Sequence, residues 1–402
     1  MNILVFLPRF PYPLDKGDKL RAFNQIKELS QNNDIYLFAL TRNEIKQEDF
    51  NLVKQYCKDI FIQRLSLGGI LLYLLRCLFT NLPLQVALFT TNKAKKNFSY
   101  YFDTHSFDAV YFQFVRSIEY AKIVKKKTYS NAIERKNSNT RLVLDFQDCL
   151  SMNMYRRSKI SSLVMRLLLQ EEARRLRLYE KKCLFLFDAT TIITEKDRDC
   201  IVSKKKDEIK IIANGVDKSF FSYDKKQEKE YEIIFSGNMS YKPNIVAAKY
   251  LINCIMPLVW KARPKVKVCL AGSSPVKEVM DLRSDRVEVT GWVEDMREYY
   301  SKSLIYVAPM QIGTGLQNKL LEAMAMQLPC ITTPIAFCAL NAKENQQILV
   351  GKDEKELALL ILKLLDNKAL RESIAKEGNS FVRENYSWQK STLELEKLLA
   401  KG

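Results

Sequence analysis

Residues 308–333 read "APMQIGTGLQNKLLEAMAMQLPCITT", and an apolar run at 304–307 stands directly before them. Two glycines, Gly313 and Gly315, follow this run, and the segment after them is rich in Leu, Ala and Met, which are strong helix formers. We therefore predict a strand, a glycine turn, a helix and a second strand at 330–334. Glu322 is the one acidic residue in the apolar half of this helix, which makes it a candidate functional residue.

The same alternation of strands and helices runs along the whole chain. Short continuous apolar runs between helices indicate a parallel sheet that is covered on both faces. The expected fold class is α/β, with two doubly wound Rossmann-like domains that face each other across a cleft. Besides 304–309 and 330–334, the candidate strands are 3–7, 35–40, 59–65, 107–114, 141–148, 233–240, 267–274 and 287–293.

The two series of strands also predict the domain organisation. A long helix rich in Arg and Leu is expected at 159–187, and Thr194 should cap the short helix after the next strand. The charged segment 224–232 is interpreted as a linker beside the hinge. The predicted parts are a first domain at 1–205, a second domain at 206–380, and a C-terminal helix at 381–402 that packs back on the first domain.

Length and composition are typical of a soluble globular protein. The chain has 402 residues, 47% hydrophobic and 27% charged, which is enough for two ordinary domains. Its nine cysteines form no Cys-x-x-Cys pair, which argues against a zinc site or a disulfide framework. The N-terminal run lacks a basic leader, and the apolar run at 65–79 is shorter than the roughly 20 residues that a spanning helix needs. We therefore expect a cytoplasmic protein.

The charge is strongly basic. The formal net charge is +18, and residues 121–182 alone hold 16 basic and 6 acidic side chains. Such a field attracts polyanions or an anionic membrane surface, although a charge run can also be a merely solvated surface. We expect an anionic membrane surface as the partner, and no nucleic acid.

Several familiar enzyme classes lack their motifs here. Neither a complete Gly-x-Gly-x-x-Gly turn nor a Gly-x4-Gly-Lys-Ser/Thr loop is present, which argues against a dehydrogenase and a P-loop kinase. His105 is the single histidine, so designs that need several histidines are excluded. Doubly wound sheets bind ligands at the carboxyl ends of their strands, and helix N-termini there can hold a diphosphate. The glycines expected at those ends are Gly17, Gly237, Gly272, Gly291, Gly313 and Gly315.

Three stretches resemble the glycosyltransferases of family 4, and more narrowly the exopolysaccharide-associated sugar transferases. This resemblance implies a GT-B fold, with an acceptor-binding first domain and a nucleotide-sugar-binding second domain. It implies transfer of a sugar to a glycan or lipid-linked glycan, with retention and with neither metal ion nor cofactor. The stretches are "FLPRFPYPLDKGDKLRAFNQIKEL" (6–29), "EEARRLRLYEKKC" (171–183) with "TEKDRD" (194–199), and "SGNMSYKPN" (236–244) through "GTGLQNKLLEAMAMQLP" (313–329).

The resemblance gives Glu322 a role, because in this superfamily the matching glutamate hydrogen-bonds the ribose hydroxyls of the donor. A carboxylate can accept both hydrogen bonds of a vicinal diol, and charge-assisted bonds are strong. The alternative is a carboxylate near a helix start that the helix dipole stabilises. Many relatives carry a second glutamate where this chain has Thr314. The expected donor-binding residues are Gly17, Asp18, Gly237, Asn238, Gly313, Thr314, Gly315, Leu316, Gln317, Asn318 and Glu322.

Catalysis requires positive charge at the departing diphosphate and a base at the acceptor. Lys319 is the first candidate cation and Lys242 the second, although either could be an ordinary surface lysine. Asp148, at the end of a predicted strand, is a better candidate base than Asp145, although it could be a capping aspartate. Two other classes stay open, namely a sugar-nucleotide epimerase of the same fold and a non-enzymatic polyanion- or membrane-binding protein.

An apolar stretch at 67–84 lies in the same half of the chain as the basic region 121–182. A short apolar helix with basic residues nearby is typical of an element that lies on anionic lipid. The alternative is a buried core helix. Because the relatives commonly extend lipid-linked sugars, the resemblance favours a peripheral membrane position.

Overall fold

The computed structural model describes residues 1–130, 139–159, 161–223, 227–312 and 315–400, and it divides the chain into two units. The first unit comprises Met1–Ala213 with Trp388–Gly402, and the second comprises Asn214–Ser387. The division therefore falls at 213/214 and not at 205/206, because the strand at 210–211 still pairs with the first sheet. The described part of the expected linker 224–232 lies inside the second unit.

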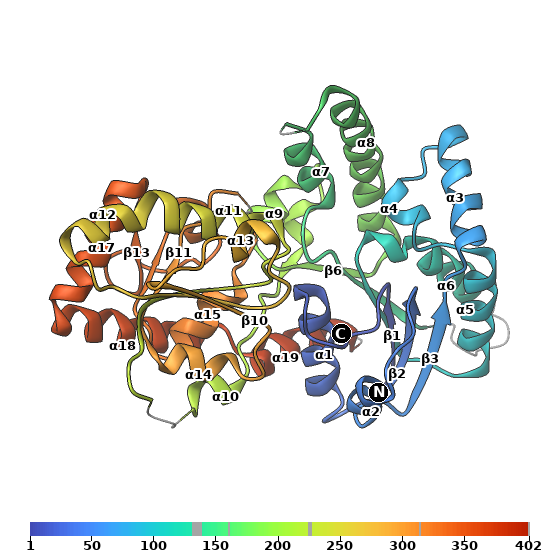
Figure 1. Ribbon diagram of the computed structural model, residues 1–402. Coiled ribbons are helices and arrows are strands. Elements are labelled where there is room, and N and C mark those ends of the chain that lie inside the picture. The colour runs from blue at the N-terminus through green and yellow to red at the C-terminus, as the bar shows by residue number, and fades with distance from the viewer. Residues whose placement is uncertain (131–138, 160, 224–226, 313–314, 401–402) are drawn as a thin grey trace. The chain divides into compact units, whose positions relative to one another are not determined.

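The first unit contains a seven-stranded parallel sheet in the order β3-β2-β1-β4-β5-β6-β7 (Figure 1). Its strands are β1 (Asn2–Leu7), β2 (Asp34–Thr41), β3 (Asp59–Arg64), β4 (Ala109–Gln113), β5 (Arg141–Asp145), β6 (Ala189–Ile192) and β7 (Lys210–Ile211). Its helices are α1 (Gly17–Leu29), α2 (Gln47–Lys54), α3 (Leu67–Phe79), α4 (Leu84–Ala87), α5 (Asn92–Thr104), the 3-10 turn η1 (Val115–Ser117), α6 (Ile118–Ser130), α7 (Leu150–Lys159), α8 (Leu163–Leu186), α9 (Glu195–Cys200), η2 (Lys206–Glu208) and α19 (Trp388–Leu399).

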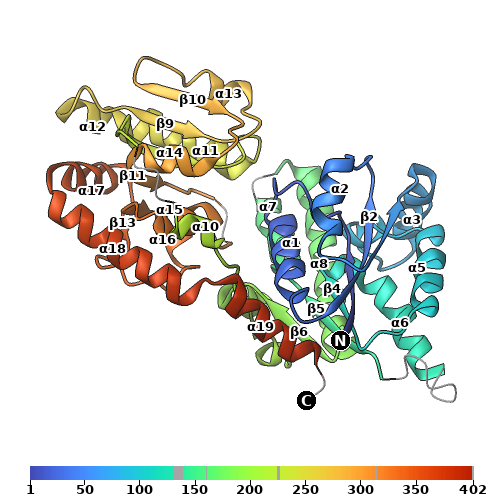
Figure 2. The same ribbon diagram turned by 90° about the horizontal axis from the view of Figure 1, so that it is seen from below.

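Side chains of this sheet alternate between two cores, as the pleat requires. Leu4 and Phe6 of β1 face the core that contains α5 and α6, whereas Ile3, Val5 and Leu7 face the opposite core. Figure 2 shows α1 and α19 on one side of the sheet and α5 and α6 on the other. Helix α19 is fixed to this unit by Leu395 and Leu399 in the second core and by a 2.7 Å bond from Arg141 Nε to the Leu398 carbonyl.

The second unit contains a six-stranded parallel sheet in the order β10-β9-β8-β11-β12-β13. Its strands are β8 (Tyr231–Ser236), β9 (Val268–Ala271), β10 (Val287–Gly291), β11 (Ser303–Ala308), β12 (Cys330–Thr332) and β13 (Leu349–Val350). Its helices are α10 (Lys218–Phe221), α11 (Lys242–Tyr250), the π-helical turn η3 (Leu251–Ile255), α12 (Met256–Ala262), α13 (Lys277–Met280), α14 (Met296–Ser301), α15 (Asn318–Ala325), α16 (Pro334–Phe337), α17 (Glu354–Asp366) and α18 (Lys368–Asn385).

Both sheets confirm the doubly wound fold predicted from the sequence. Strand order reverses between β1 and β4 in the first sheet and between β8 and β11 in the second, and such reversal points are where open sheets bind ligands. Thr194 is the N-cap of α9, as predicted, because its hydroxyl accepts from the Asp197 N–H. The single helix expected at 159–187 is wrong in its start, because α7 already covers Leu150–Lys159 and α8 begins at Leu163.

One helical segment in the described part of the chain, Lys242–Ala262, has the length and apolar composition of a membrane crossing. This is weak evidence by itself, because core helices of globular domains meet the same criteria.

Candidate functional site

Three glycine-containing loops meet at the carboxyl edge of the second sheet. A Cβ on Gly272, whose φ is +142°, would lie 1.8 Å from the Gly237 carbonyl oxygen, so no larger residue fits there. The Gly237 N–H donates to the Ala271 carbonyl over 3.0 Å, and the Gly272 N–H donates to the Gly291 carbonyl over 3.2 Å. The loops after β8, β9 and β10 are thereby held together beside the point where strand order reverses.

Glu322 is the fifth residue of α15, and its side chain is 8% exposed. The alternative was that the dipole at the helix start stabilises this carboxylate. It is wrong, because the helix begins at Asn318 and has no acidic residue in its first turn. Lys319 Nζ lies 3.0 Å from Glu322 Oε2, and the Tyr300 hydroxyl donates to the same oxygen over 3.4 Å. Two donors therefore fix the orientation of a carboxylate that is otherwise surrounded by Leu, Ala and Met.

Tyr300 and Ser236 are site residues that the sequence reasoning missed. Ser236 is the last residue of β8, and its Oγ lies 2.8 Å from the Tyr300 hydroxyl, which links Glu322 to the Gly237 loop. Burial, together with the nearby charge of Glu322, raises the pKa of Tyr300 well above its usual value. This phenol stays protonated and can act only as a fixed donor to the carboxylate. No local motif distinguishes Tyr300 in the sequence, because only the fold places α14 against α15.

The segment from β11 to α15 holds the predicted donor-binding residues 313–317. Gly313 and Thr314 lie outside the described residues. A Cβ on Gly315 would meet no other atom within 4 Å, so packing against the protein does not explain that glycine. Leu316 and Gln317 lead into α15, whose N-cap residue Gln317 makes no side-chain cap. Asn318 Oδ1 accepts a 3.1 Å bond from Asn214 Nδ2, which fixes the first helical residue.

Asn238 and Lys242 lie on the neighbouring β8 loop. Asn238 Oδ1 accepts from the N–H and the hydroxyl of Ser240, and the Asn238 carbonyl accepts from Asn244 Nδ2 over 2.9 Å. Lys242 is exposed and begins α11, where the helix dipole disfavours a cation unless an anion is nearby. Its proposed role remains a prediction, as does that of Lys319, which pairs with Glu322.

At the carboxyl edge of the first sheet, three arginines surround one aromatic ring. Arg9, Arg42 and Arg116 follow β1, β2 and β4, and their guanidinium carbons lie 5.8, 5.4 and 5.1 Å from the centre of the Phe89 ring. Burial and the neighbouring Arg9 charge lower the pKa of Arg116 to about 10. Three like charges gathered around one ring are suited to bind an anion, which would reduce their mutual repulsion. The sequence reasoning did not single out these arginines, because they are far apart along the chain.

Gly17 and Asp18 lie beside this arginine cluster. Gly17 is the first residue of α1, and Asp18 Oδ2 accepts from Arg9 Nη1 over 2.7 Å. The N-cap position of α1 is held by Lys16 and not by Asp18. Asp18 therefore fixes Arg9 and reduces the net positive charge.

Asp148 joins the cluster from the third residue after β5, so it lies in the loop and not at the end of the strand as predicted. Its Oδ2 accepts from Asn153 Nδ2 over 2.9 Å, while its buried Oδ1 has no partner among the described residues. Burial, and secondarily the charge of Asp197, raises the pKa of Asp148 to about 7. A carboxyl group with that pKa can exchange a proton near neutral pH.

Backbone strain accompanies this site. Phe114 and Gln147, which follow β4 and β5, have φ values of 63° and 62°, a region that bulky side chains rarely adopt. Such strain persists where surrounding structure enforces it, and it is common at functional sites. Gln147 directly precedes Asp148, and its amide donates to Gln113 Oε1 over 3.0 Å, which holds the loop in place.

Asp145, the weaker candidate base, has a structural position. Arg21 Nε donates to its Oδ2 over 2.6 Å, and both side chains are completely buried. The Tyr111 hydroxyl and the Thr191 hydroxyl also donate to this carboxylate, over 3.0 and 2.9 Å. With these partners, Asp145 has no free position from which to take a proton from an acceptor. Among the residues that the structure describes, no three His, Cys, Asp or Glu side chains form a group that could hold a metal ion.

The two doubly wound parallel sheets have the architecture of the GT-B class, and comparisons with known proteins show what the chain is similar to. Residues 230–367 match the family model described as glycosyl transferases group 1. The chain is 23% identical over 97% of its length to an uncharacterized 44.6 kDa protein in the cps region of Klebsiella pneumoniae, with 97% of that protein covered. It is 27% identical to the capsular polysaccharide biosynthesis glycosyltransferase CapM of Staphylococcus aureus, over 56% of this chain and 64% of CapM.

Solved structures agree with the fold. Anabaena Alr3699/HepE in complex with UDP superposes with a TM-score of 0.65 at 14% identity, covering 99% of each chain. The predicted resemblance is confirmed in the second unit, where the match to the group 1 glycosyl transferases falls.

Proposed function

We propose that the chain transfers a sugar from a nucleotide-sugar donor to a glycan or lipid-linked glycan during surface polysaccharide synthesis. The observation that carries this proposal is Glu322, a buried carboxylate fixed by Tyr300 and Lys319 next to an uncapped helix start. Its oxygens suit a ribose diol, and the first N–H groups of α15 suit a diphosphate. The named function of CapM and the UDP complex of HepE support polysaccharide synthesis and a UDP-linked donor.

In the proposed reaction, the glycosyl–phosphate bond breaks and the acceptor oxygen forms a new bond at the same anomeric carbon with retention. Positive charge at the loop around α15 and from Lys242 stabilises the departing diphosphate. Asp148 accepts the acceptor proton. The arginines around Phe89 orient an acceptor that carries negative charge.

We expect Glu322→Ala to weaken binding of UDP by about tenfold or more, because loss of a charged acceptor that leaves its donors unpaired costs roughly 1.5–3 kcal/mol. Calorimetry with UDP on the folded variant measures this. Glu294→Ala, which removes an exposed acid near α14, is the matched control and should bind normally. Equal affinity in the Glu322 variant would remove this residue from the site, and absence of UDP binding to the parent protein would favour a non-enzymatic role.

We expect turnover to survive EDTA. The sequence "DRD" at 197–199 does not act as an Asp-x-Asp motif that binds a metal ion and the diphosphate. Asp197 is buried against Thr194, and Asp199 pairs with Arg198. Lysine and backbone N–H groups then supply the charge that a metal would supply. The measurement is UDP release with and without chelator, and loss that manganese or magnesium restores would contradict metal independence.

We also propose that the first unit lies on the cytoplasmic surface of an anionic membrane. The alternative that 67–84 is a buried core helix does not fit α3, since Leu67 and Phe79 are 84% and 87% exposed while Ile70 and Cys77 are buried. The first half of α8 exposes Leu163, Val164, Met165, Leu167 and Leu168. Figure 1 shows α3 and α8 extending from the same side of the first unit.

Liposome co-sedimentation tests this membrane contact. Binding should rise with phosphatidylglycerol content and fall with salt, since each basic residue near an anionic surface contributes about 1 kcal/mol. Leu71→Gln with Leu168→Gln should weaken binding, because each removes an exposed apolar side chain. Leu359→Gln, which changes a leucine of α17 in the second unit that is also more than half exposed, is the control. Equal sedimentation of both variants would contradict the assignment of this face.

A further inference from the structure

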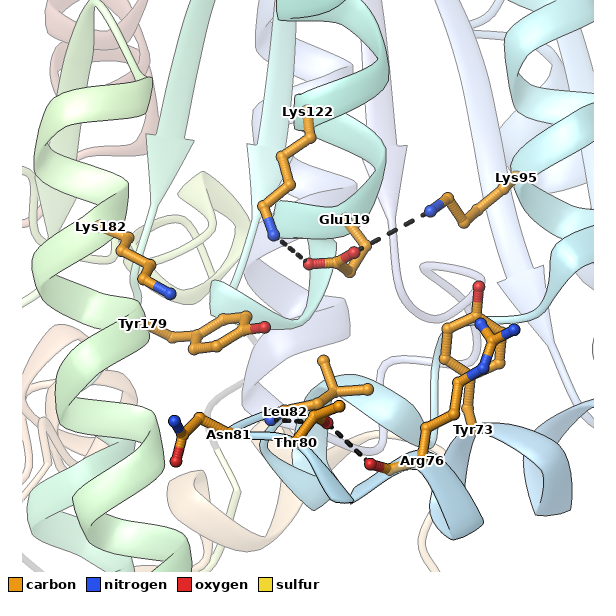
Figure 3. A pocket seen from close by; sticks show the side chains of 10 residues that line it. All are labelled: Tyr73, Arg76, Thr80, Asn81, Leu82, Lys95, Glu119, Lys122, Tyr179 and Lys182. Atoms are coloured by element: carbon orange, nitrogen blue, oxygen red, sulfur yellow. Dashed lines mark hydrogen bonds and ion pairs between the residues drawn. The ribbon is translucent and has the colours of Figure 1, made fainter. Parts of the chain in front are cut away.

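A second basic site lies on the outer helical layer of the first unit. A hollow of about 320 Å³ opens between α3, α5, α6 and α8. It is lined by four cationic side chains and one carboxylate, together with two tyrosines and the turn after α3. The lining residues are Tyr73, Arg76, Thr80, Asn81, Leu82, Lys95, Glu119, Lys122, Tyr179 and Lys182 (Figure 3).

Charge in this hollow is not balanced by its own carboxylate. Glu119 pairs with both Lys95, at 3.9 Å, and Lys122, at 2.5 Å. No ion pair within the described part of the chain involves Arg76 or Lys182. Each of these two lies instead over an aromatic ring, Arg76 over Tyr73 at 4.8 Å and Lys182 over Tyr179 at 5.0 Å. The hollow therefore carries an excess of positive charge that an anion would neutralise.

The framework of the hollow is fixed by contacts that do not use these cations. The Tyr73 hydroxyl donates to Asn92 Oδ1 over 3.0 Å, and Arg175 donates to the Cys77 carbonyl over 2.6 Å. Arg174 holds the Asn81 side chain over 3.0 Å. In Figure 3, Tyr73 and Tyr179 lie on opposite sides and Leu82 lies below Glu119, with open space between them. The walls are thus preformed, while Arg76 and Lys182 are exposed and able to turn toward a ligand.

The surroundings distinguish a lipid phosphate from a free one. Arg76 lies on α3 with Leu72 four residues before it and Phe79 three residues after it, so all three share one side of the helix. Leu72, Leu75 and Phe79 are 45%, 50% and 87% exposed. An anion held by Arg76 would therefore have an apolar surface beside it, which is the arrangement that a phosphate attached to acyl or prenyl chains requires.

We propose that this hollow binds the phosphate or diphosphate group of a membrane amphiphile, with the apolar side of α3 against its chains. The inference rests on the membrane contact proposed above, but not on donor binding. The hollow shares no lining residue with the arginine cluster around Phe89 or with the donor site at Glu322, so a lipid phosphate there would use side chains that the proposed transfer does not use.

Calorimetry on the full chain tests the site with two probes, dioctanoyl phosphatidic acid below its micellar concentration and inorganic diphosphate. The double variant Arg76→Glu/Lys182→Glu should bind the lipid probe at least tenfold more weakly than the parent protein. The matched control is Lys181→Glu, which changes the exposed neighbour of Lys182 outside the hollow and should bind normally. UDP affinity, measured on the same proteins, should not change.

Equal lipid affinity in the double variant and the control would overturn the site. Affinity for inorganic diphosphate equal to that for the lipid probe would overturn the lipid-borne assignment, because the apolar side of α3 would then contribute nothing. Normal UDP binding alongside either result would leave the proposed glycosyl transfer intact. If the parent protein binds the lipid probe but not UDP, only the proposed donor site is contradicted.

Discussion

Asp148→Asn should slow sugar transfer by about 10²- to 10⁴-fold, the usual contribution of a positioned general base. Asparagine keeps the size and can still accept from Asn153, but it cannot take a proton from the acceptor. Because burial raises the pKa of Asp148 to about 7, the parent rate should rise with pH through that value as the carboxylate forms. The variant should lose this rise. The measurement is UDP release from a UDP-sugar with membrane extract as the acceptor, from pH 5.5 to 8.5.

Asp207→Asn serves as the control, since this aspartate is exposed on η2. It should keep both the rate and the pH profile of the parent protein. A parent-like pH rise in Asp148→Asn would show that another group titrates, and a parent-like rate would remove Asp148 from the reaction.

The same pKa predicts how the free energy of unfolding depends on pH. The sign of this dependence is opposite to that of most aspartates. The folded pKa of Asp148, about 7, lies above the ordinary value of 3.8, so between these pH values the folded state holds more protons than the unfolded state. The contribution of Asp148 to the free energy of unfolding is therefore highest below about pH 4 and declines as pH rises to about 7. Asp148→Asn lacks that decline, which denaturant titrations at pH 5 and pH 8 can separate from a loss of activity.

Local patterns were enough to predict five of the six strands of the second sheet, all except the two-residue β13. In the run from β11 to α15, Leu, Ala and Met favour the helix, and the glycines Gly313 and Gly315 separate it from the strand. Glu322 is conspicuous in this helix because its neighbours are apolar. The structure confirms the strand and the helix that flank this glycine segment, and it adds that Glu322 is buried. Tyr300 and Ser236 could not be predicted, since only long-range packing places them beside that carboxylate.

Long-range placement explains the errors in the first unit as well. Arg9, Arg42 and Arg116 are ordinary basic residues in a Lys- and Arg-rich chain, and only the parallel order of β2, β1 and β4 brings them around Phe89. Asp145 and Asp148 are three residues apart and looked alike in sequence. The sheet separates them, because Asp145 is the last paired residue of β5 and points into a completely buried network, whereas Asp148 lies in the strained loop that follows.

Asp145→Ala should destabilise the first unit by about 3–5 kcal/mol, the cost of removing one member of a buried ion pair. The Arg21 guanidinium would remain charged and completely buried without its main partner, and the Tyr111 and Thr191 hydroxyls would lose an acceptor. Denaturant unfolding followed by fluorescence measures the loss. The transition of the second unit should not move, because Asp145 and its partners all belong to the first unit.

Two control variants distinguish the cost of leaving a buried charge without its partner from the cost of breaking an ion pair in general. Asp34→Ala breaks the exposed pair with Lys58 and should cost far less than Asp145→Ala, because water screens both charges. The double variant Arg21→Met/Asp145→Leu removes both buried charges together, and it should be more stable than Asp145→Ala because no uncompensated charge remains. If Asp145→Ala costs no more than Asp34→Ala, water reaches Arg21 and the network is not buried. If the double variant is the less stable of the two, the hydrogen bonds to Asp145 determine how β5 is held beside β4 and β6, and the ion pair is needed to position the loop that carries Asp148.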